Sequence, residues 1–157
     1  MIKKHWKTYA LWILVTEAVG ALSGFLSRSG MELYTSAMEK PPLSPPGILF
    51  PIVWIILYGL MGFGAASVSL TPPSKERSNG LNLYVAQLIV NFFWSLIFFN
   101  AQAYGLAFLW LLLLWVLVFA MIMTFIKTSP LAAGLQAPYL LWLTFAAYLN
   151  AGVWYLN

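Results

Sequence analysis

The chain has no cysteine and a single histidine among its 157 residues. The lack of cysteine excludes disulfides, thiolate nucleophiles and iron–sulfur ligation. His5 stands beside Lys4 at the amino terminus, away from any other metal-ligating residue. Three of the four acidic residues, Glu32, Glu39 and Glu76, are expected in loops, without a paired acid on a helix. Conventional acid–base, nucleophilic or metal-assisted catalysis therefore has almost no residues to use, and we expect neither a catalytic residue nor a metal site.

Charged residues are also scarce. They make up 8% of the chain, against roughly a quarter of an ordinary soluble domain, while 62% of the residues are hydrophobic. So few polar side chains cannot cover a water-soluble globule, and the composition predicts an integral membrane protein. The net charge of +4 comes from basic residues scattered over the termini and loops. This distribution favours attraction to anionic lipid and not nucleic-acid binding.

Three long stretches, 41–74, 78–126 and 128–157, contain no charged residue. A helix needs roughly 20 apolar residues to cross a bilayer. The stretch 78–126 would make two helices, because the polar segment 100–105 ends in glycine and favours a tight turn. We therefore predict one all-α domain over residues 1–157, a bundle of five transmembrane helices. Their expected positions are about 9–26, 47–70, 81–99, 106–126 and 131–156.

Basic residues are divided unevenly between the two sides of such a bundle. With five crossings, only Arg28 and Lys40 fall on the side opposite the amino terminus, so the positive-inside rule places the amino terminus in the cytoplasm. Glu17 interrupts the first apolar stretch, and no convincing cleavage site follows, so we expect a retained span and not a signal peptide. The short loops and the lack of an Arg-rich presequence predict a multi-pass protein of a bacterial cytoplasmic membrane, with an organellar membrane as the alternative.

The first predicted helix carries two further features. Glu17 is an ionisable residue inside a span, which suggests a ligand contact or a proton relay, although a carboxyl group hydrogen-bonded between packed helices would be a purely structural alternative. Gly20 and Gly24 form a small-xxx-small pair. Such a pair lets two helix backbones approach closely, and it indicates either packing within the bundle or a dimer.

Aromatic residues make up 17% of the chain, and eight of them are tryptophans. Several fall deep inside predicted spans, at helical spacing that places aromatic rings and amides on one face. The candidate ligand-binding residues are Phe50, Trp54, Tyr58, Gln87, Asn91, Trp94, Trp142, Ala146 and Asn150. An aromatic cage of this kind would stack on a flat conjugated ligand while the amides orient its polar groups. An ordinary helix-packing core, with the amides bonded across helices, is the alternative.

A proline-rich segment precedes the second predicted helix. Its prolines and glycine are Pro41, Pro42, Pro45, Pro46 and Gly47. A proline in the first turn of a helix lacks an N–H that would be unpaired anyway, and Ser44 is placed to cap the helix. Pro51, one turn further on, is expected to remove a backbone hydrogen bond and widen the helix beside Trp54.

Three segments together resemble the signature of the TspO/MBR family, the tryptophan-rich sensory proteins and translocator proteins. They are 40–58 (KPPLSPPGILFPIVWIILY), 87–95 (QLIVNFFWS) and 138–150 (PYLLWLTFAAYLN). The resemblance covers essentially the whole chain. It implies a five-helix bundle, often a homodimer, with a pocket near the end where the loop between the first two helices closes over it. It also implies porphyrin binding, with Trp54 and Trp142 facing the ligand, with Asn91, Trp94 and Ala146 at other pocket positions, and with the proline-rich segment shaping the pocket rim.

The resemblance leaves several functions open. A tetrapyrrole-binding sensor or carrier is the first expectation. The alternatives are light- and oxygen-dependent degradation of the porphyrin beside oxidisable tryptophans, and facilitated transport of small hydrophobic ligands. A powered transporter is disfavoured, because the chain shows no inverted repeat and no ion-coupling pair.

The expected ligand is a metal-free, protoporphyrin-like molecule, with no obligatory cofactor. The deep residues able to ligate haem iron are few: Tyr58, Met61, Met121 and Met123. The carboxy terminus ends without a basic residue after Tyr155, which animal members carry in a cholesterol-recognition pattern. Sterol recognition through that pattern is therefore not expected.

Overall fold

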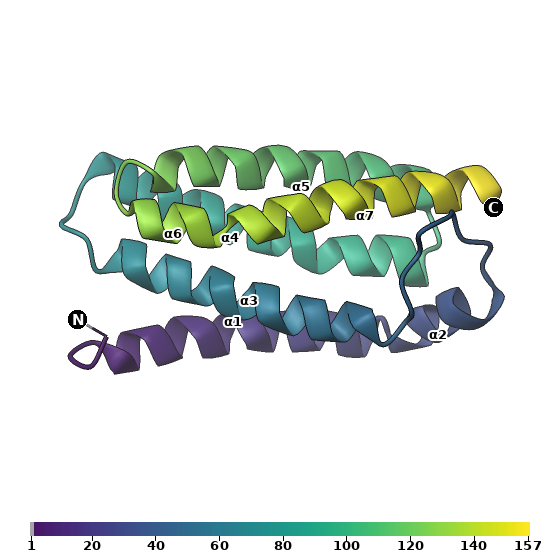
Figure 1. Ribbon diagram of the computed structural model, residues 1–157, viewed down its shortest axis with the longest axis horizontal. Helices are drawn as coiled ribbons and strands as arrows, with labels where there is room; N and C mark the ends of the chain where they lie inside the picture. The colour runs from purple at the N-terminus through teal and green to yellow at the C-terminus, as the bar shows by residue number, and fades with distance from the viewer. Residues whose placement is uncertain (1) are drawn as a thin grey trace.

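The computed structural model describes residues 2–157, and long helices lie side by side along one axis (Figure 1). In chain order the elements are α1 (Trp6–Leu26), α2 (Arg28–Ala37), α3 (Leu49–Ser69), α4 (Lys75–Ser95), the π-helix η1 (Leu96–Asn100), α5 (Tyr104–Phe125), α6 (Pro130–Leu135) and α7 (Ala137–Leu156). No strand occurs within residues 2–157. The prediction of an all-α protein is confirmed.

The surface of the bundle is apolar along much of its length. Large hydrophobic side chains such as Leu11, Ile56 and Leu109 are exposed on α1, α3 and α5. Within residues 2–157, four helical segments are long and apolar enough to cross a membrane, namely α1, α3, α4 with η1, and α5. Such a surface is solvated by lipid and not by water, so the protein is a multi-pass membrane protein. The fifth predicted span corresponds to α7, and the number of crossings stays a prediction.

The helices occupy the predicted order, but α4 begins at Lys75 and not near residue 81. Ser74 caps it, since its hydroxyl oxygen accepts a hydrogen bond from the Arg77 N–H at 3.0 Å. Glu76 lies in the first turn, where a negative charge favours the helix. The early turns of α4 are polar, so an apolar-run criterion misses them. The predicted turn over 100–105 is confirmed, because η1 ends at Asn100 and α5 starts at Tyr104.

The helix predicted over 131–156 is divided into α6 and α7. Pro138 lies in the first turn of α7 and has no N–H to continue the ladder from α6. Gln136, between the two helices, is fully buried, and its side-chain amide donates to the Leu60 carbonyl of α3 at 3.2 Å. This hydrogen bond links the junction between α6 and α7 to α3. A hydropathy pattern misses it because the segment is apolar on both sides.

Close helix contacts depend on glycine in α1 and α3. Gly62 of α3 lies against the backbone of Trp12 and Ile13 in α1, and Gly20 of α1 lies against the ring of Tyr58. A side chain on Gly24 would meet nothing within 4 Å. Of the predicted small-xxx-small pair, Gly20 thus serves packing within the bundle, whereas Gly24 borders open space.

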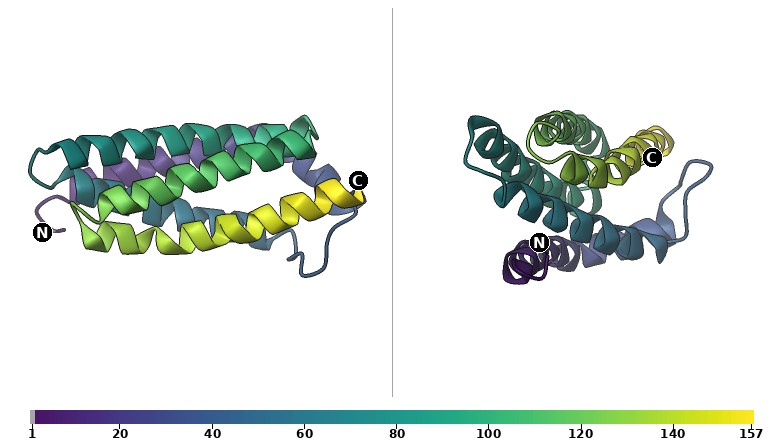
Figure 2. Two further views of the ribbon diagram at one scale, coloured as in Figure 1. Left: turned by 90° about the horizontal axis from the view of Figure 1, so that it is seen from above. Right: turned by 60° about the vertical axis from the view of Figure 1, so that its left-hand side comes forward.

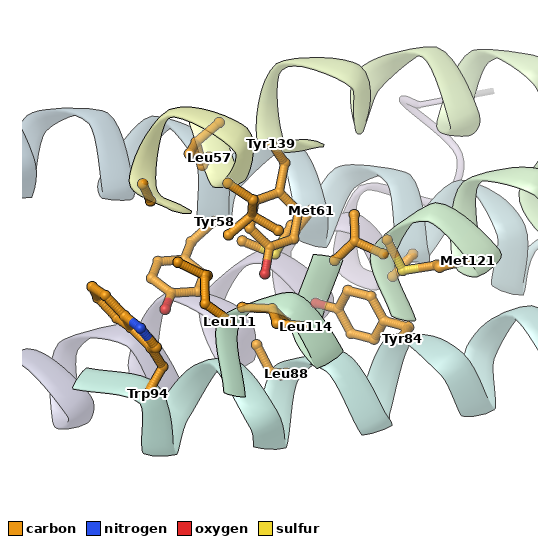
Figure 3. Close-up of a cluster of buried hydrophobic side chains, with 14 of the residues drawn as sticks. Leu57, Tyr58, Met61, Tyr84, Leu88, Trp94, Leu111, Leu114, Met121 and Tyr139 are labelled. Carbon is orange, nitrogen blue, oxygen red and sulfur yellow. The ribbon is translucent and has the colours of Figure 1, made fainter. Parts of the chain in front are cut away.

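The centre of the bundle is filled by side chains from several helices (Figure 3). The rings of Tyr58, Tyr84 and Tyr139 enter from α3, α4 and α7, and their hydroxyl groups point into the interior. α1 packs on α3 and α4, while α5 packs on α4 and α7. At the end of the bundle that holds the carboxy terminus, α2 continues from α1, and the loop from α2 to α3 passes beside the end of α7 (Figures 1 and 2). The candidate functional site lies at this end of the bundle.

Candidate functional site

A cavity of about 360 Å³ lies at the end of the bundle near α2. Its walls come from α1, α2, α3, α4, η1 and α7. The aromatic side chains that line it are Tyr34, Phe50, Trp54, Tyr58, Trp94, Phe98, Phe99 and Trp142. Pro51 and Ile55, which also line it, are exposed on α3, so the cavity reaches the outer face of the bundle. Its volume lies in the range of small-molecule sites, roughly 300–1,000 Å³.

The tryptophans of α3 and α7 form a corner of the cavity. The rings of Trp54 and Trp142 are 6.3 Å apart between centroids, at 89° to each other. Phe50 lies edge-on to Trp142 at 5.9 Å. A flat ligand that stacks on one indole would therefore meet the edge of the other, an arrangement that the quadrupoles of aromatic rings favour.

Seven of the nine predicted ligand-binding residues line this cavity: Phe50, Trp54, Tyr58, Trp94, Trp142, Ala146 and Asn150. Gln87 and Asn91 do not. Asn150 lies at the boundary and is already engaged, since its Oδ1 accepts from Trp94 Nε1 at 3.1 Å and its Nδ2 donates to the Tyr104 carbonyl at 2.9 Å. The sequence pattern thus covers two environments, an aromatic cavity and a polar core behind it.

That polar core is a chain of hydrogen bonds across three helices. The Tyr58 hydroxyl donates to Asn91 Oδ1 at 2.8 Å, and Asn91 Nδ2 donates to the Tyr139 hydroxyl at 2.6 Å. The Tyr139 hydroxyl in turn donates to Gln87 Oε1 at 2.7 Å. These amides are therefore paired with the protein, as the helix-packing alternative requires, and they hold Tyr58 in place behind the cavity.

Replacing Tyr139 by phenylalanine is expected to destabilise the bundle by about 1–2 kcal/mol, because Asn91 and Gln87 would each lose a buried partner. Thermal unfolding of the detergent-solubilised protein measures this loss. Ligand affinity should change little, because Tyr139 does not line the cavity. An unchanged unfolding midpoint would show that the hydroxyl contributes nothing to stability.

The proline-rich segment spans the end of the bundle and is fastened to α7. Pro41 packs against Gly152, and the Pro42 carbonyl accepts a hydrogen bond from the Tyr148 hydroxyl at 2.6 Å. Gly47 lies beside Thr35 of α2. Pro41, Pro42, Pro45, Pro46 and Gly47 are all absent from the cavity lining. The segment connects α2, α3 and α7, while the lining itself comes from the neighbouring helices.

Two local predictions about this segment are wrong. Ser44 does not cap α3, since its hydroxyl donates to the Pro41 carbonyl at 2.7 Å and α3 starts later, at Leu49. Because of this later start, Pro51 is the third residue of α3, where an N–H has no intrahelical partner. The proline therefore removes no helical hydrogen bond, and α3 runs unbroken to Ser69.

Sequence reasoning missed the walls that α2 and η1 supply. Tyr34 of α2 is buried and meets the rings of Phe98 and Phe99 edge-on, at 5.7 and 5.6 Å. The wider π-turn puts the adjacent Phe98 and Phe99 both inside, which ordinary helical spacing does not predict. Burial and, to a smaller extent, the nearby Tyr104 raise the pKa of Tyr34 above its ordinary value, so its hydroxyl is neutral at physiological pH, as that of a free tyrosine also is. The sequence signal for the α2 wall was the pair Met31 and Tyr34, which are three residues apart within an otherwise polar segment.

The cavity offers few polar groups to a ligand. The Trp142 Nε1–H is itself buried and has no hydrogen-bond partner among the described residues, so it adds no exposed donor to the cavity wall. Glu17 contributes a carboxylate from α1. Within residues 2–157 no three His, Asp or Glu side chains come together to hold a metal ion. The site is therefore suited to binding a flat, largely apolar molecule.

The fold and cavity define a class: a helical multi-pass membrane protein with an aromatic pocket of ligand size and a proline-rich loop that joins α2 to α3 and contacts α7. Residues 12–156 match the model of the TspO/MBR family, and the chain belongs to that family. It is 35% identical to the tryptophan-rich protein TspO of Chlorobaculum tepidum over 157 residues, covering 99% of each chain. It is 39% identical to the translocator protein of Ovis aries over 135 residues, covering 85% of this chain and 79% of the relative. The tryptophan-rich sensory protein of Cereibacter sphaeroides is 30% identical over 149 residues, covering 95% and 92%.

Proposed function

We propose that the protein crosses the membrane five times, with its amino terminus in the cytoplasm, and binds a porphyrin-type tetrapyrrole in the aromatic cavity as a sensor or carrier. The observation that carries this proposal is the perpendicular pair Trp54 and Trp142 in a cavity otherwise lined mainly by apolar groups. The names of two relatives, a translocator protein and a tryptophan-rich sensory protein, support a role as a carrier or a sensor. With α7 as the fifth span, the basic residues fall mainly on the side of the amino terminus.

A metal-free, protoporphyrin-like ligand suits the chemistry of the walls, because the aromatic rings supply stacking surface and the lining described within residues 2–157 contains no histidine to ligate haem iron. Two charged residues suggest how the ligand would lie, Glu17 in the lining and Lys40 beside the lining residue Tyr34. Lys40 lies over the ring of Tyr34, 5.1 Å from its centroid, at the loop end, whereas Glu17 lies near the middle of α1. The ligand's carboxylates are therefore expected toward Lys40 and away from Glu17.

The proposed setting is the cytoplasmic membrane of a bacterium, since similar proteins occur in bacteria, and the proposed assembly is a homodimer. Occupancy of the cavity would signal by favouring one arrangement of the covering loop, which contacts α2 and α7. No obligatory cofactor is required for this role.

Light-dependent degradation of the porphyrin is the second candidate function. It is favoured by one observation, the two oxidisable indoles of Trp54 and Trp142 that line the same cavity. An excited porphyrin there would generate reactive oxygen beside both rings. This activity would need light and oxygen, whereas sensing and carriage would not.

The experiment that tests both candidates is a dark titration with protoporphyrin IX followed by illumination. Tryptophan quenching in detergent reports binding, and porphyrin absorbance then reports bleaching. We expect saturable binding by the wild type. The double variant Trp54→Phe, Trp142→Phe is expected to bleach the porphyrin at the rate of free porphyrin if the cavity indoles drive degradation.

The matched control is Trp115→Phe, Trp154→Phe, which removes two tryptophans that do not line the cavity. It should behave as the wild type. Saturable binding with bleaching no faster than free porphyrin in the wild type would support the sensor or carrier alone. The absence of saturable binding would refute the tetrapyrrole proposal.

A further inference from the structure

Glu17 places a carboxylate in the wall of the cavity, near the middle of α1. The lining within residues 2–157 contains no second carboxylate and no lysine or arginine. Charged groups inside a span are costly and normally face a cavity or a partner. A carboxylate at this depth thus calls for a positively charged or hydrogen-bond-donating neighbour.

The protein itself does not supply that neighbour. Within the described chain, neither a hydrogen-bond donor nor an opposite charge acts on the Glu17 carboxylate. Two hydroxyl groups of the lining are engaged elsewhere, as Tyr58 donates to Asn91 and Ser23 donates to the Phe92 carbonyl at 2.9 Å. The carboxylate is therefore left available to a molecule in the cavity.

The packing around Glu17 also keeps it uncovered. On the facing helix α3 stands Gly59, and a Cβ atom built there would lie 3.5 Å from Glu17 Oε2. The lack of a side chain at Gly59 leaves one side of the carboxylate open. Gly20, one turn along α1, lets the Tyr58 ring lie directly against α1. A ligand in the cavity could thus reach Glu17 directly.

We propose that Glu17 gives the part of this cavity beside α1 a preference for a positively charged group on a flat hydrophobic molecule, such as an aromatic amine protonated at neutral pH. Such a cation would pair with Glu17 while its rings lie against Trp54, Trp94 or Trp142, whose faces attract cations. The ion pair would also offset the cost of a carboxylate within the membrane. Glu17 is then a specificity-determining residue of the cavity.

This inference rests on the proposal that the cavity binds a flat ligand, but not on that ligand being a porphyrin. The two probes are 9-aminoacridine, a three-ring cation at neutral pH, and acridine, its uncharged counterpart of similar shape. Their affinities are measured by tryptophan quenching in the same detergent for the wild type, Glu17→Gln and Glu32→Gln. Glu32 is the matched control, because it is an exposed acid on α2 outside the lining.

We expect Glu17→Gln to weaken 9-aminoacridine binding about tenfold, or about 1.4 kcal/mol, while acridine binding changes less than about twofold. Glu32→Gln should leave both affinities unchanged. Equal losses for both probes would show a purely structural role for Glu17, and no change for either would show that the acid is neutral or out of reach; both results overturn the proposal. If wild type binds 9-aminoacridine in a Glu17-dependent way but does not bind protoporphyrin IX, the selectivity stands and the tetrapyrrole proposal fails.

Discussion

Replacing Gly62 by leucine is expected to lower the stability of the bundle by about 1–3 kcal/mol or more, the largest stability effect that we predict for a single residue. A Cβ atom at this position would lie 2.6 Å from the Cα atom of Ile13 and 2.9 Å from the Trp12 carbonyl oxygen. These are backbone atoms of α1, so no side-chain rotation can relieve the clash. The two helices would have to separate.

Separation of α1 from α3 would also disturb the cavity, since both helices supply its walls. Thermal unfolding in detergent measures the loss of stability. The matched control is Gly134→Leu, because Gly134 is exposed on α6 and a Cβ atom there meets nothing within 4 Å. Equal unfolding midpoints for the two variants would show that the close approach of α1 and α3 is not required.

Replacing Gly24 by phenylalanine is expected to reduce protoporphyrin IX affinity more than tenfold, or more than about 1.4 kcal/mol, without destabilising the protein. Gly24 lines the cavity, yet a Cβ atom there meets nothing within 4 Å. The Cβ atom would therefore displace no protein atom, and the ring beyond it is expected to occupy cavity space that a ligand needs. Replacing a glycine within a helix by phenylalanine also stabilises the helix by a few tenths of a kcal/mol, because glycine has the lower helix propensity.

Dark titration and thermal unfolding of the same preparation separate the two effects. Gly134→Phe is the control, since it adds the same ring at an exposed position outside the cavity. It should bind as the wild type. Unimpaired binding by Gly24→Phe would place the ligand elsewhere, and a lower unfolding midpoint would show that the space beside Gly24 is needed for packing.

Much of the fold follows from local sequence because membrane helices satisfy their own backbone groups. The long charge-free runs and the polar turn over 100–105 predict the order of α1, α3, α4 and α5. Features that lack an apolar signal were missed. The polar start of α4 depends on the Ser74 cap, and the break at Gln136 depends on Pro138 and on a bond to α3.

The aromatic residues of the candidate site could be predicted from the sequence, but which of the neighbouring amides line the cavity could not. Helical spacing places Phe50, Trp54 and Tyr58 on one face of α3, and the family resemblance predicts that Trp54 and Trp142 face the same ligand; in the structure their ring centroids are 6.3 Å apart. It could not separate Asn150, which lines the cavity, from Asn91, which is enclosed by Tyr58 and Tyr139. Both are amides on the expected face, and only the position of neighbouring helices distinguishes them.

The sequence by itself determined the class of this protein, since its charge-free runs require a lipid environment and its three motif segments indicate the family that residues 12–156 match. Only the tertiary structure decided which residues surround the cavity. The π-turn of η1 turns Phe98 and Phe99 inward, Tyr34 packs on them from α2, and Glu17 has no hydrogen-bond partner among residues 2–157. The physical reason is that hydropathy and helical period act along one helix, whereas a cavity is the space left where several helices fail to meet.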